Sequence, residues 1–278
     1  MAERLATRFR TALVTGASTG LGRAFARMLL AEGVAVWGTS RDAARLADLT
    51  QEHPQAFHPV VLELADAAAA AQAFRAAEQA AGGFDLVVNN AGFGAFGVFA
   101  DTDFAVWREQ LEVMLVNTTL ISHLALVGMR QRNRGALVNV SSLAAEFPLP
   151  FQSAYNMAKA GLTALSESLM VECAGTGVAV IDLRPGDFRT EFEGAVRRPP
   201  AGQGDPRLPR VWAAFAKMMQ EGPAPEEAAA ALRGALLRGR SGTVRCGRFF
   251  QAVLAPLLAR FGSLSLKRKV QAGYFGLD

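Results

Sequence analysis

The sequence predicts an α/β fold, a single domain (1–278) built on a doubly wound parallel sheet of about seven strands flanked by helices. Three observations predict it. Short apolar runs alternate with helical stretches along the chain, as in parallel strands joined by crossover helices. The first apolar run breaks into a glycine-rich turn that leads into a helix. The chain has 278 residues, of which 51% are hydrophobic, which is enough for one well-buried core.

Four apolar runs in the first half of the chain have the length of buried strands. A helix at Arg23–Glu32 follows the glycine turn. An alanine-rich helix follows the third run; Asp66 is its expected N-cap, and it ends near Ala80. Helices between successive strands are what a parallel sheet requires. The four predicted strands are Thr11–Thr15, Val34–Thr39, Val60–Leu64 and Leu86–Val88.

The second half repeats the alternation of strand and helix. A long helical periodicity covers Phe104–Arg130, and another helix opens near Ser153 and extends to Cys173. Pro185 and Gly186 end the last inner strand sharply. We expect strands at Ala136–Val140, Val178–Leu183 and, at the sheet edge, Thr243–Cys246, with further helices at Val211–Met219 and Ala224–Arg238.

Two segments near the end of the chain lie outside this alternation. Residues 190–222 include a stretch rich in proline, glycine and charge, which predicts a mobile substrate loop or lid. Residues 249–278 are predicted to form a helical tail, in which apolar clusters alternate with the basic residues Lys267, Arg268 and Lys269. This pattern is compatible with a helix on a membrane surface. We favour a tail that covers the core or a subunit contact.

Composition and charge exclude several classes of protein. The net charge is +4, but the basic residues are dispersed and form no stripe with aromatic residues, which argues against nucleic-acid binding. The two cysteines and three histidines lack the spacing of disulfides or metal ligands, so we expect no metal. The basic residues 1–10 precede a strand without a signal-peptide apolar region, and no apolar run is long enough to span a bilayer. We therefore expect a reduced, soluble, cytoplasmic protein.

The turn after the first strand has the composition of a phosphate-binding loop. It reads Gly-Ala-Ser-Thr-Gly-Leu-Gly and leads into a helix. Small residues let a diphosphate approach the backbone, and the helix N-terminus offers free N–H groups and the positive end of its dipole. Glycines often serve only as turns, but the place of this turn after the first strand favours a dinucleotide site. The predicted contacts are Gly16, Ser18, Thr19, Gly20, Leu21 and Gly22.

The end of the second strand predicts which dinucleotide is bound. In a doubly wound sheet this end meets the adenosine ribose, where an acidic residue would repel a 2′-phosphate. Here the residues are Ser40 and Arg41, and a guanidinium can grip a phosphate with two hydrogen bonds. We therefore expect NADP(H) over NAD(H); the alternative is that Arg41 only solvates a helix start beside Asp42. Further cofactor contacts are expected at the ends of the next two strands, from Glu63, Leu64, Asn90, Ala91 and Gly92.

Three side chains between residues 142 and 159 form a set that can protonate a carbonyl oxygen. Tyr155 and Lys159 are four residues apart in the same predicted helix, so both leave from one face. A nearby ammonium lowers the pKa of a phenol and makes it a better general acid near neutral pH. Ser142 would hydrogen-bond the same oxygen and stabilise charge there. Alone, the Tyr–Lys pair is more simply a half-buried aromatic beside a solvated lysine; the serine and the glycine turn favour catalysis.

In the order of these motifs, the chain resembles the short-chain dehydrogenase/reductase family from the first strand to Thr190, and more loosely in the tail. The family pattern T-G-x-x-x-G-x-G matches Thr15–Gly22, N-N-A-G matches Asn89–Gly92, and P-G-x-x-x-T matches Pro185–Thr190. The resemblance implies a Rossmann fold, NAD(P) binding and, because long helices pair between subunits in this family, a homodimer or homotetramer. It also implies a catalytic tetrad at Asn117, Ser142, Tyr155 and Lys159.

The resemblance gives each of these positions an expected role. Tyr155 would be the general acid or base, Lys159 would hold the nicotinamide ribose and acidify Tyr155, and Ser142 would orient the carbonyl. Asn117 would anchor a water that leads protons out, although a helix-interior asparagine usually faces solvent or bonds locally. Glu63 replaces the usual aspartate near adenine, and Asp187 has no assigned role. Cofactor contacts are also implied for Tyr155, Lys159, Pro185, Gly186, Phe188 and Thr190.

The substrate is less closely defined by these motifs. The apolar loop Leu143–Phe151 and the nearby aromatic residues indicate a hydrophobic carbonyl compound or alcohol. Because cells usually keep the NADP pool reduced, we expect NADPH-driven reduction of a ketone or aldehyde. Two alternatives are a non-catalytic NADP(H)-binding sensor or scaffold, and an epimerase or dehydratase on the same fold. The predicted substrate contacts are Phe93, Phe96, Ser142, Leu143 and Phe192.

Overall fold

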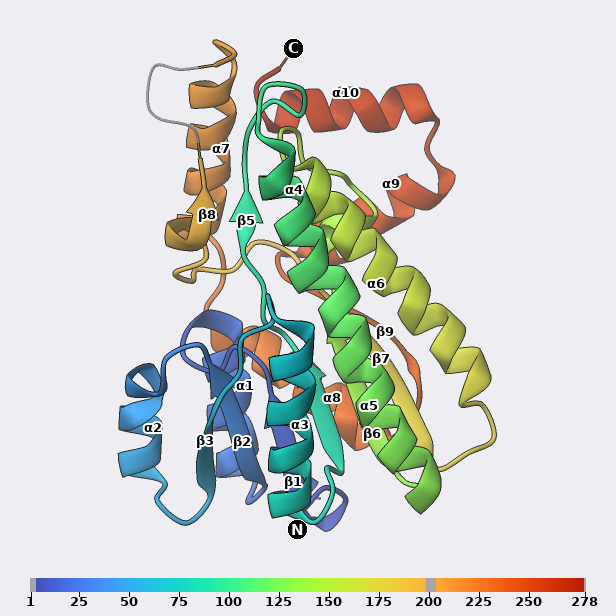
Figure 1. Ribbon diagram of the computed structural model, residues 1–278. Helices are drawn as coiled ribbons and strands as arrows, with labels where there is room; N and C mark the ends of the chain where they lie inside the picture. Colours follow the sequence, from blue (N-terminus) through green and yellow to red (C-terminus); the bar gives the residue numbers. More distant parts are fainter. Residues whose placement is uncertain (1–3, 199–203, 278) are drawn as a thin grey trace.

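Seven strands pair in parallel to form the central sheet (Figure 1). The computed structural model describes residues 4–198 and 204–277, so residues 199–203 of the predicted lid and the ends of the chain lie outside the described residues. The parallel sheet flanked by helices confirms the predicted fold class. The strands are β1 (Thr11–Val14), β2 (Ala35–Ser40), β3 (Phe57–Val61), β4 (Leu86–Asn89), β6 (Gly135–Val140), β7 (Val178–Pro185) and β9 (Gly242–Cys246).

The order of the strands creates a crevice near the middle of the sheet. That order is β3-β2-β1-β4-β6-β7-β9. From β1 the chain adds β2 and β3 on one side. It then returns to β4 on the other side of β1 and continues through β6 and β7 to β9 at the opposite edge. The connections of β1 and β4 therefore run in opposite directions, and such a switch point is where doubly wound sheets bind ligands, at the carboxyl ends of the strands.

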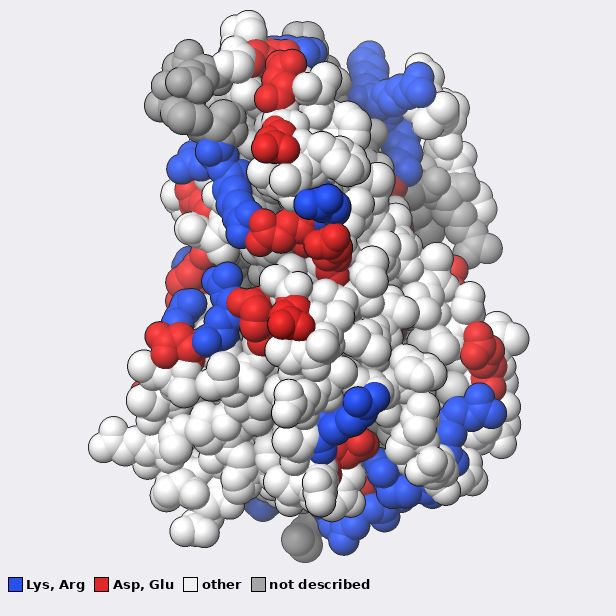
Figure 2. Space-filling model, viewed as in Figure 1, with Lys and Arg blue, Asp and Glu red and all other residues white. Residues whose placement is uncertain are grey.

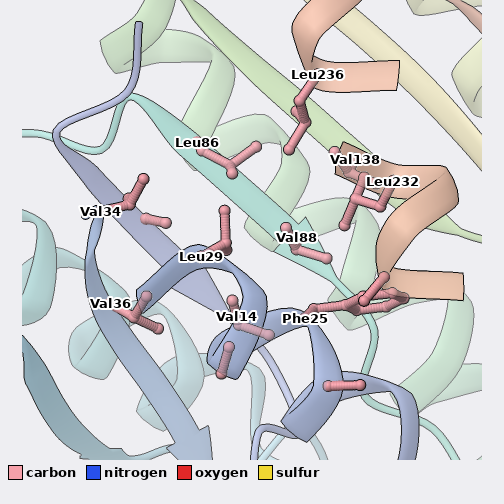
Figure 3. Packing of buried hydrophobic residues seen from close by; sticks show 14 of the residues in the cluster. Val14, Phe25, Leu29, Val34, Val36, Leu86, Val88, Val138, Leu232 and Leu236 are labelled. Carbon is pink, nitrogen blue, oxygen red and sulfur yellow. The ribbon is translucent and has the colours of Figure 1, made fainter. Parts of the chain in front are cut away.

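One face of the sheet is covered by α1 (Gly20–Ala31) and α8 (Pro225–Arg238), which contact each other. Figure 3 shows how Phe25 and Leu29 of α1 meet Leu232 and Leu236 of α8 over the valines of the central strands. Alternate residues of each strand point to this face and the others to the opposite face. Because helices cover both faces, the strands are apolar on both sides. The short helix α2 (Ala47–Glu52) lies beside the edge strand β3.

The opposite face is covered by α3 (Ala67–Ala81), α5 (Asn117–Arg132) and α6 (Ser153–Glu172), seen in front of the sheet in Figure 1. α4 (Phe104–Leu111) joins α5 through one π-helical turn, Glu112–Val116. The combined helix of 29 residues is long and apolar enough to span a bilayer by composition, contrary to the expectation from the sequence. In the structure its buried face packs on the sheet and on α3 and α6, as an apolar core helix does.

The lid and tail segments stand beyond the carboxyl ends of the strands, at the top of Figure 1. The lid contains β8 (Val196–Arg197), which pairs with β5 (Gly94–Ala95), and α7 (Leu208–Gln220). The tail contains a π-helical turn at Phe250–Leu254, then α9 (Ala255–Phe261) and α10 (Leu264–Tyr274). Both segments contribute to a separate small apolar cluster that includes Phe96, Leu208, Val211, Phe215, Met219 and Phe275.

Several element boundaries differ from those predicted, among them those of the third strand and the first helix. The third strand is Phe57–Val61 rather than Val60–Leu64. It is an edge strand, where a proline such as Pro59 is tolerated. Because it contains polar positions, it lacks the continuous apolar run from which strands were predicted. The residues after it form a loop instead of a strand, and in this loop the Glu63 carboxylate accepts a hydrogen bond from the N–H of Ala65. The first helix begins at Gly20 rather than Arg23, because the glycine turn itself winds into the helix.

Charges of both signs are interspersed on the face shown in Figure 2, with basic side chains gathered over α10 and at the lower end of the molecule. Several of the exposed charges are paired. Arg197 binds Glu109, and Arg27 binds Glu52. Exposed pairs of this kind contribute at most about 1 kcal/mol each to stability, so the buried apolar layers carry the fold.

Candidate active site

A cavity of about 730 Å³ opens at the carboxyl ends of the central strands. Its floor is formed by the glycine turn after β1, the end of β2, and the residues that follow β4, β6 and β7. Residues of segments 190–222 and 249–278 line its upper side. Most residues predicted to contact a cofactor or substrate line this single cavity; the exceptions are Gly22, Phe96 and Asn117.

The glycine turn is held in place by the residues that follow β4. Thr15 Oγ1 accepts hydrogen bonds from the N–H groups of Asn90 (2.9 Å) and Ala91 (3.0 Å). In return, Asn90 Nδ2 donates to the carbonyl oxygen of Thr15 (3.0 Å). Gly16 has a φ of +68°, which favours glycine. Gly22 lies beneath the turn rather than at the cavity wall, and a Cβ there would collide with the Gly16 carbonyl oxygen and the Asn90 amide.

The N-terminus of α1 already holds an anionic group. The N–H of Gly20 donates to Glu191 Oε2 at 3.1 Å, and Thr190 packs against the same glycine. A carboxylate at this place acts as a stand-in for a phosphate oxygen, because free N–H groups and the helix dipole favour any oxyanion. The turn, with its room for close approach and its donor groups, therefore fits the diphosphate of a dinucleotide.

The end of β2 presents basic side chains to the cavity. Ser40, Arg41 and Arg45 all line it, and Arg45 was not among the predicted contacts. The helix start that follows is capped by Asp42, whose carboxylate accepts from the N–H of Ala44 at 2.9 Å. The N-terminus of this short helix is therefore satisfied by Asp42 without a contribution from the Arg41 side chain. Glu63 and Leu64 line the cavity beside this basic end.

Ser142, Tyr155 and Lys159 meet at the other end of the cavity. Lys159 is 5% exposed; its Nζ lies 5.7 Å from the centre of the Tyr155 ring and donates to the carbonyl oxygen of Val140 at 2.7 Å. Ser142 is the N-cap of a 3₁₀ turn, and its Oγ accepts from the N–H of Ala144 at 3.0 Å. Two hydroxyl groups and an ammonium thus converge on one small volume.

Burial dominates the pKa values of this group. It raises the pKa of Tyr155 to about 12; a hydrogen bond with Ser142 opposes this shift, and the charge of Asp187 adds to it. Burial lowers the pKa of Lys159 to about 8, against the influence of Asp182. The pKa of the phenol is therefore raised rather than lowered as expected, because desolvation is the largest influence on it. At neutral pH Tyr155 is a protonated phenol, the form that can donate a proton.

Asn117 lies away from the cavity wall, where α5 begins after the π-helical turn. It is 5% exposed, and its Nδ2 donates to the carbonyl oxygen of Leu64 at 2.6 Å. It therefore neither faces solvent nor bonds within its helix; it ties the helix to the loop after β3. Single π-helical turns within helices are frequent at functional sites.

Comparison with known proteins agrees with this geometry. A sequence model described as short chain dehydrogenase matches residues 10–201. The chain belongs to the short-chain dehydrogenase family. A protein from Myxococcus xanthus named an uncharacterized oxidoreductase is 39% identical over 187 residues, covering 66% of this chain and 74% of its own. A probable NADP-dependent dehydrogenase from Haemophilus influenzae is 34% identical over 178 residues, covering 63% of this chain and 70% of its own.

A solved structure also resembles this short-chain dehydrogenase along nearly its whole length. The crystal structure of a short-chain dehydrogenase from Streptomyces avermitilis has a TM-score of 0.82 and 31% identity, and covers 95% of this chain and 99% of its own. The protein is therefore an oxidoreductase of this family with a dinucleotide-binding site. Among the described residues, no group of histidine, cysteine and acidic side chains could hold a metal ion.

Beneath Lys159, this short-chain dehydrogenase has a buried ionic network that was not predicted from the sequence. Asp182 is fully buried and accepts hydrogen bonds from Ser141 Oγ and from Arg184 Nε, the latter at 2.7 Å. Arg184 also binds Glu167 at 2.8 Å, and it binds Glu146. Because Asp182 raises the pKa of Lys159, this network favours the charged form of the lysine.

Replacing Asp182 should move the alkaline limit of activity to lower pH. In Asp182→Asn the pKa of Lys159 falls further below its value of about 8, since the carboxylate that raises it is gone. A lysine loses its charge as pH rises through its pKa, so the charged form is lost at lower pH in the variant. The pH profile of kcat/KM measures this shift. Asp205, which pairs with Arg207 and does not line the cavity, provides the control variant Asp205→Asn. An alkaline limb unchanged by Asp182→Asn contradicts the coupling.

The substrate end of this short-chain dehydrogenase's cavity is lined mainly by apolar side chains. Phe93, Leu143 and Phe192 lie in its wall, as predicted. Phe96 does not; its ring packs against Phe151 and Trp212 in the small apolar cluster, with ring centres 5.8 and 5.3 Å away. The lid and the tail supply wall residues that the sequence did not indicate, since only the folded chain brings them here: Phe215, Met218, Met219, Phe250, Gln251, Val270, Gln271, Tyr274 and Phe275.

Proposed function

We propose that this short-chain dehydrogenase uses NADP(H) to interconvert an apolar ketone or aldehyde and its alcohol, and that it works in the reductive direction. The observation that carries the proposal is the meeting of Ser142, Tyr155 and Lys159 in one cavity, with Tyr155 held as a protonated phenol. A protonated phenol can give its proton to a carbonyl oxygen, as reduction requires. The apolar wall beside it supports an apolar substrate.

Different residues would bind the separate parts of the cofactor and the carbonyl group of the substrate. The N–H groups of the glycine turn would hold the diphosphate, Arg41 and Arg45 the 2′-phosphate, and Lys159 the nicotinamide ribose. When bound, the dinucleotide supplies the hydride. The hydroxyl groups of Ser142 and Tyr155 orient the carbonyl oxygen and stabilise the charge that develops on it.

Proton transfer is completed by Tyr155. Its O–H gives a proton to the oxygen of the substrate, so that the product leaves as a neutral alcohol. The phenolate left behind is stabilised by the buried ammonium of Lys159 and regains a proton before the next turnover. The aromatic side chains around the cavity exclude water, and this strengthens the electrostatic interactions within it.

A screen of carbonyl compounds and alcohols tests the proposal. Nicotinamide absorbance is followed with both NADPH and NADH, over ketones and aldehydes of increasing apolar size. We expect NADPH oxidation that is strongest with apolar ketones or aldehydes. Tight cofactor binding without turnover on the whole panel would instead favour a sensor or scaffold, and product formation without net cofactor consumption an epimerase or dehydratase.

Removing Arg41 should change the cofactor preference. In Arg41→Ala we expect kcat/KM for NADPH to fall by about 10- to 100-fold while the value for NADH changes little, because a charge-assisted hydrogen bond to the 2′-phosphate is lost. Arg27→Ala is a matched control, since Arg27 lies on α1, pairs with Glu52 and does not line the cavity. Equal losses with both cofactors, or none, would contradict NADP(H) specificity.

The helices α4 to α6 also support the proposal of a homodimer or homotetramer. Large apolar side chains on them are exposed, among them Phe104 at 65% and Val171 at 77%. Apolar groups on a soluble surface are stabilised when a second copy covers them. Sedimentation velocity measures the state, and a purely monomeric protein at micromolar concentration would contradict this proposal.

A further inference from the structure

One carboxyl group beside the reactive tyrosine has no part in the chemistry described above. Asp187 follows the Pro-Gly pair after β7 and lines the cavity. It is close enough to Tyr155 for its charge to raise the pKa of that phenol. An acidic group beside the apolar wall of the substrate cavity is costly to bury unless it has partners, so its presence calls for an explanation.

The tail holds Asp187 in place through one of its two oxygens. Gln251 Nε2 and the Tyr274 hydroxyl both donate to Oδ2, the latter at 3.3 Å. Gln251 Nε2 also lies 2.9 Å from the Tyr274 hydroxyl, and Gln251 Oε1 accepts from the N–H of Asp187 at 3.3 Å. Among the described residues, no side chain or backbone group donates to Oδ1. The carboxyl group is therefore fixed by the tail and retains one acceptor for a ligand.

A second acceptor lines the same cavity one helical turn before Tyr155. Gln152 is 1% exposed, and its Oε1 has no hydrogen-bond partner within the described part of the chain. A buried amide oxygen without a partner is destabilising, and a hydrogen bond from a ligand donor removes that cost. Asp187 and Gln152, two residues in the wall of the cavity that contains Tyr155, thus each have an acceptor oxygen without a donor among the described residues.

We propose that Asp187, with Gln152 as a second acceptor, binds a hydroxyl group of the substrate, and that the substrate is an apolar ketone or aldehyde carrying a hydroxyl near its carbonyl. This inference rests on the proposed reduction. A hydroxyl suits the site better than an ammonium because it donates to an ionised carboxylate and accepts from a protonated carboxylic acid. Burial raises the pKa of Asp187, and a hydroxyl can hydrogen-bond the group in either form.

Matched pairs of ketones test this selectivity. The wild-type enzyme with NADPH is assayed on acetophenone and α-hydroxyacetophenone, and on propiophenone and β-hydroxypropiophenone, with α-aminoacetophenone as the cationic comparison. We expect kcat/KM to be at least about tenfold higher for one of the hydroxyketones than for its parent ketone. In Asp187→Leu that ratio should fall about tenfold, in Gln152→Leu by less, and in Asp187→Asn by an intermediate amount. The ratio is informative even where the variants lose overall activity.

Two controls separate the possible outcomes. Asp101→Leu changes an exposed aspartate outside the cavity and should leave the ratio unchanged, and NADPH binding by fluorescence shows that each variant is folded. A wild type that reduces both ketones equally, that prefers the amine, or whose ratio survives Asp187→Leu would overturn the inference while the proposed function stands. If no ketone is reduced, the proposed function fails on this panel. Ligand-observed NMR then compares binding of α-hydroxyacetophenone and acetophenone, and equal binding to wild type and Asp187→Leu overturns the inference independently.

Discussion

Tyr155→Phe is expected to lower kcat by at least about 10³-fold, within the range that general acid catalysis contributes. The variant keeps the ring, which packs near Phe192 with ring centres 5.9 Å apart, and loses only the hydroxyl. In the proposed mechanism that hydroxyl is the only proton donor to the substrate oxygen, since Ser142 can orient and stabilise but is a far weaker acid. NADPH affinity should stay within about twofold, because the proposed contacts with the diphosphate and the 2′-phosphate lie on the glycine turn and at the end of β2, away from the Tyr155 hydroxyl.

Single-turnover kinetics and fluorescence titration with NADPH measure the two quantities separately. The chain has only two tyrosines, and the other supplies a matched control. Tyr274→Phe removes a phenolic hydroxyl from the same cavity but from a residue that binds Asp187, so its loss of kcat should be less than about tenfold. If Tyr155→Phe retains a tenth of wild-type turnover, the proton comes from elsewhere and the proposed mechanism fails.

The sequence predicted the parts of the site that depend on short stretches of chain. A strand that ends in small residues and continues as a helix can only form a tight turn with free N–H groups, so Gly16 and Gly20 could be placed before the structure was known. The relation of Tyr155 to Lys159 is equally local, since residues four apart on a helix share a face. Strand existence followed from apolar runs, because both faces of a parallel sheet are buried.

Features that depend on contacts between distant residues were not predicted. Asp187 meets Gln251 and Tyr274, which are 64 and 87 residues further along the chain. Phe96 resembled a cavity residue by its position in a glycine-rich loop, but the pairing of β5 with β8 places its ring in the lid cluster. The direction of the Tyr155 pKa shift also depends on burial, and burial of one side chain is a property of the whole fold.

The other large effect is expected at Gly22, although this residue does not touch the cavity. A methyl group on Gly22 would collide with the carbonyl oxygen of Gly16 and the amide of Asn90. Neither group can move without a cost in stability. The Gly16 carbonyl is part of the backbone of the phosphate-binding turn, and the Asn90 amide holds that turn to the end of β4. Gly22→Ala should therefore displace the turn, weaken NADPH binding by at least about tenfold and destabilise the fold by about 1–3 kcal/mol, as overpacking of a buried site does.

Gly234→Ala gives this prediction its control, because it makes the same change within a helix of the same domain. The nearest atom to a Cβ at Gly234 is Arg238 Nη1 at 3.7 Å, an ordinary contact with the end of a flexible side chain. Alanine favours the helix over glycine by about 0.5–1 kcal/mol, so Gly234→Ala should melt at the same or a higher temperature and bind NADPH as the wild type does. Differential scanning fluorimetry with and without NADPH separates the two variants. Wild-type cofactor affinity in Gly22→Ala would show that the turn can move without loss, and that close packing beneath it is not what shapes the phosphate site.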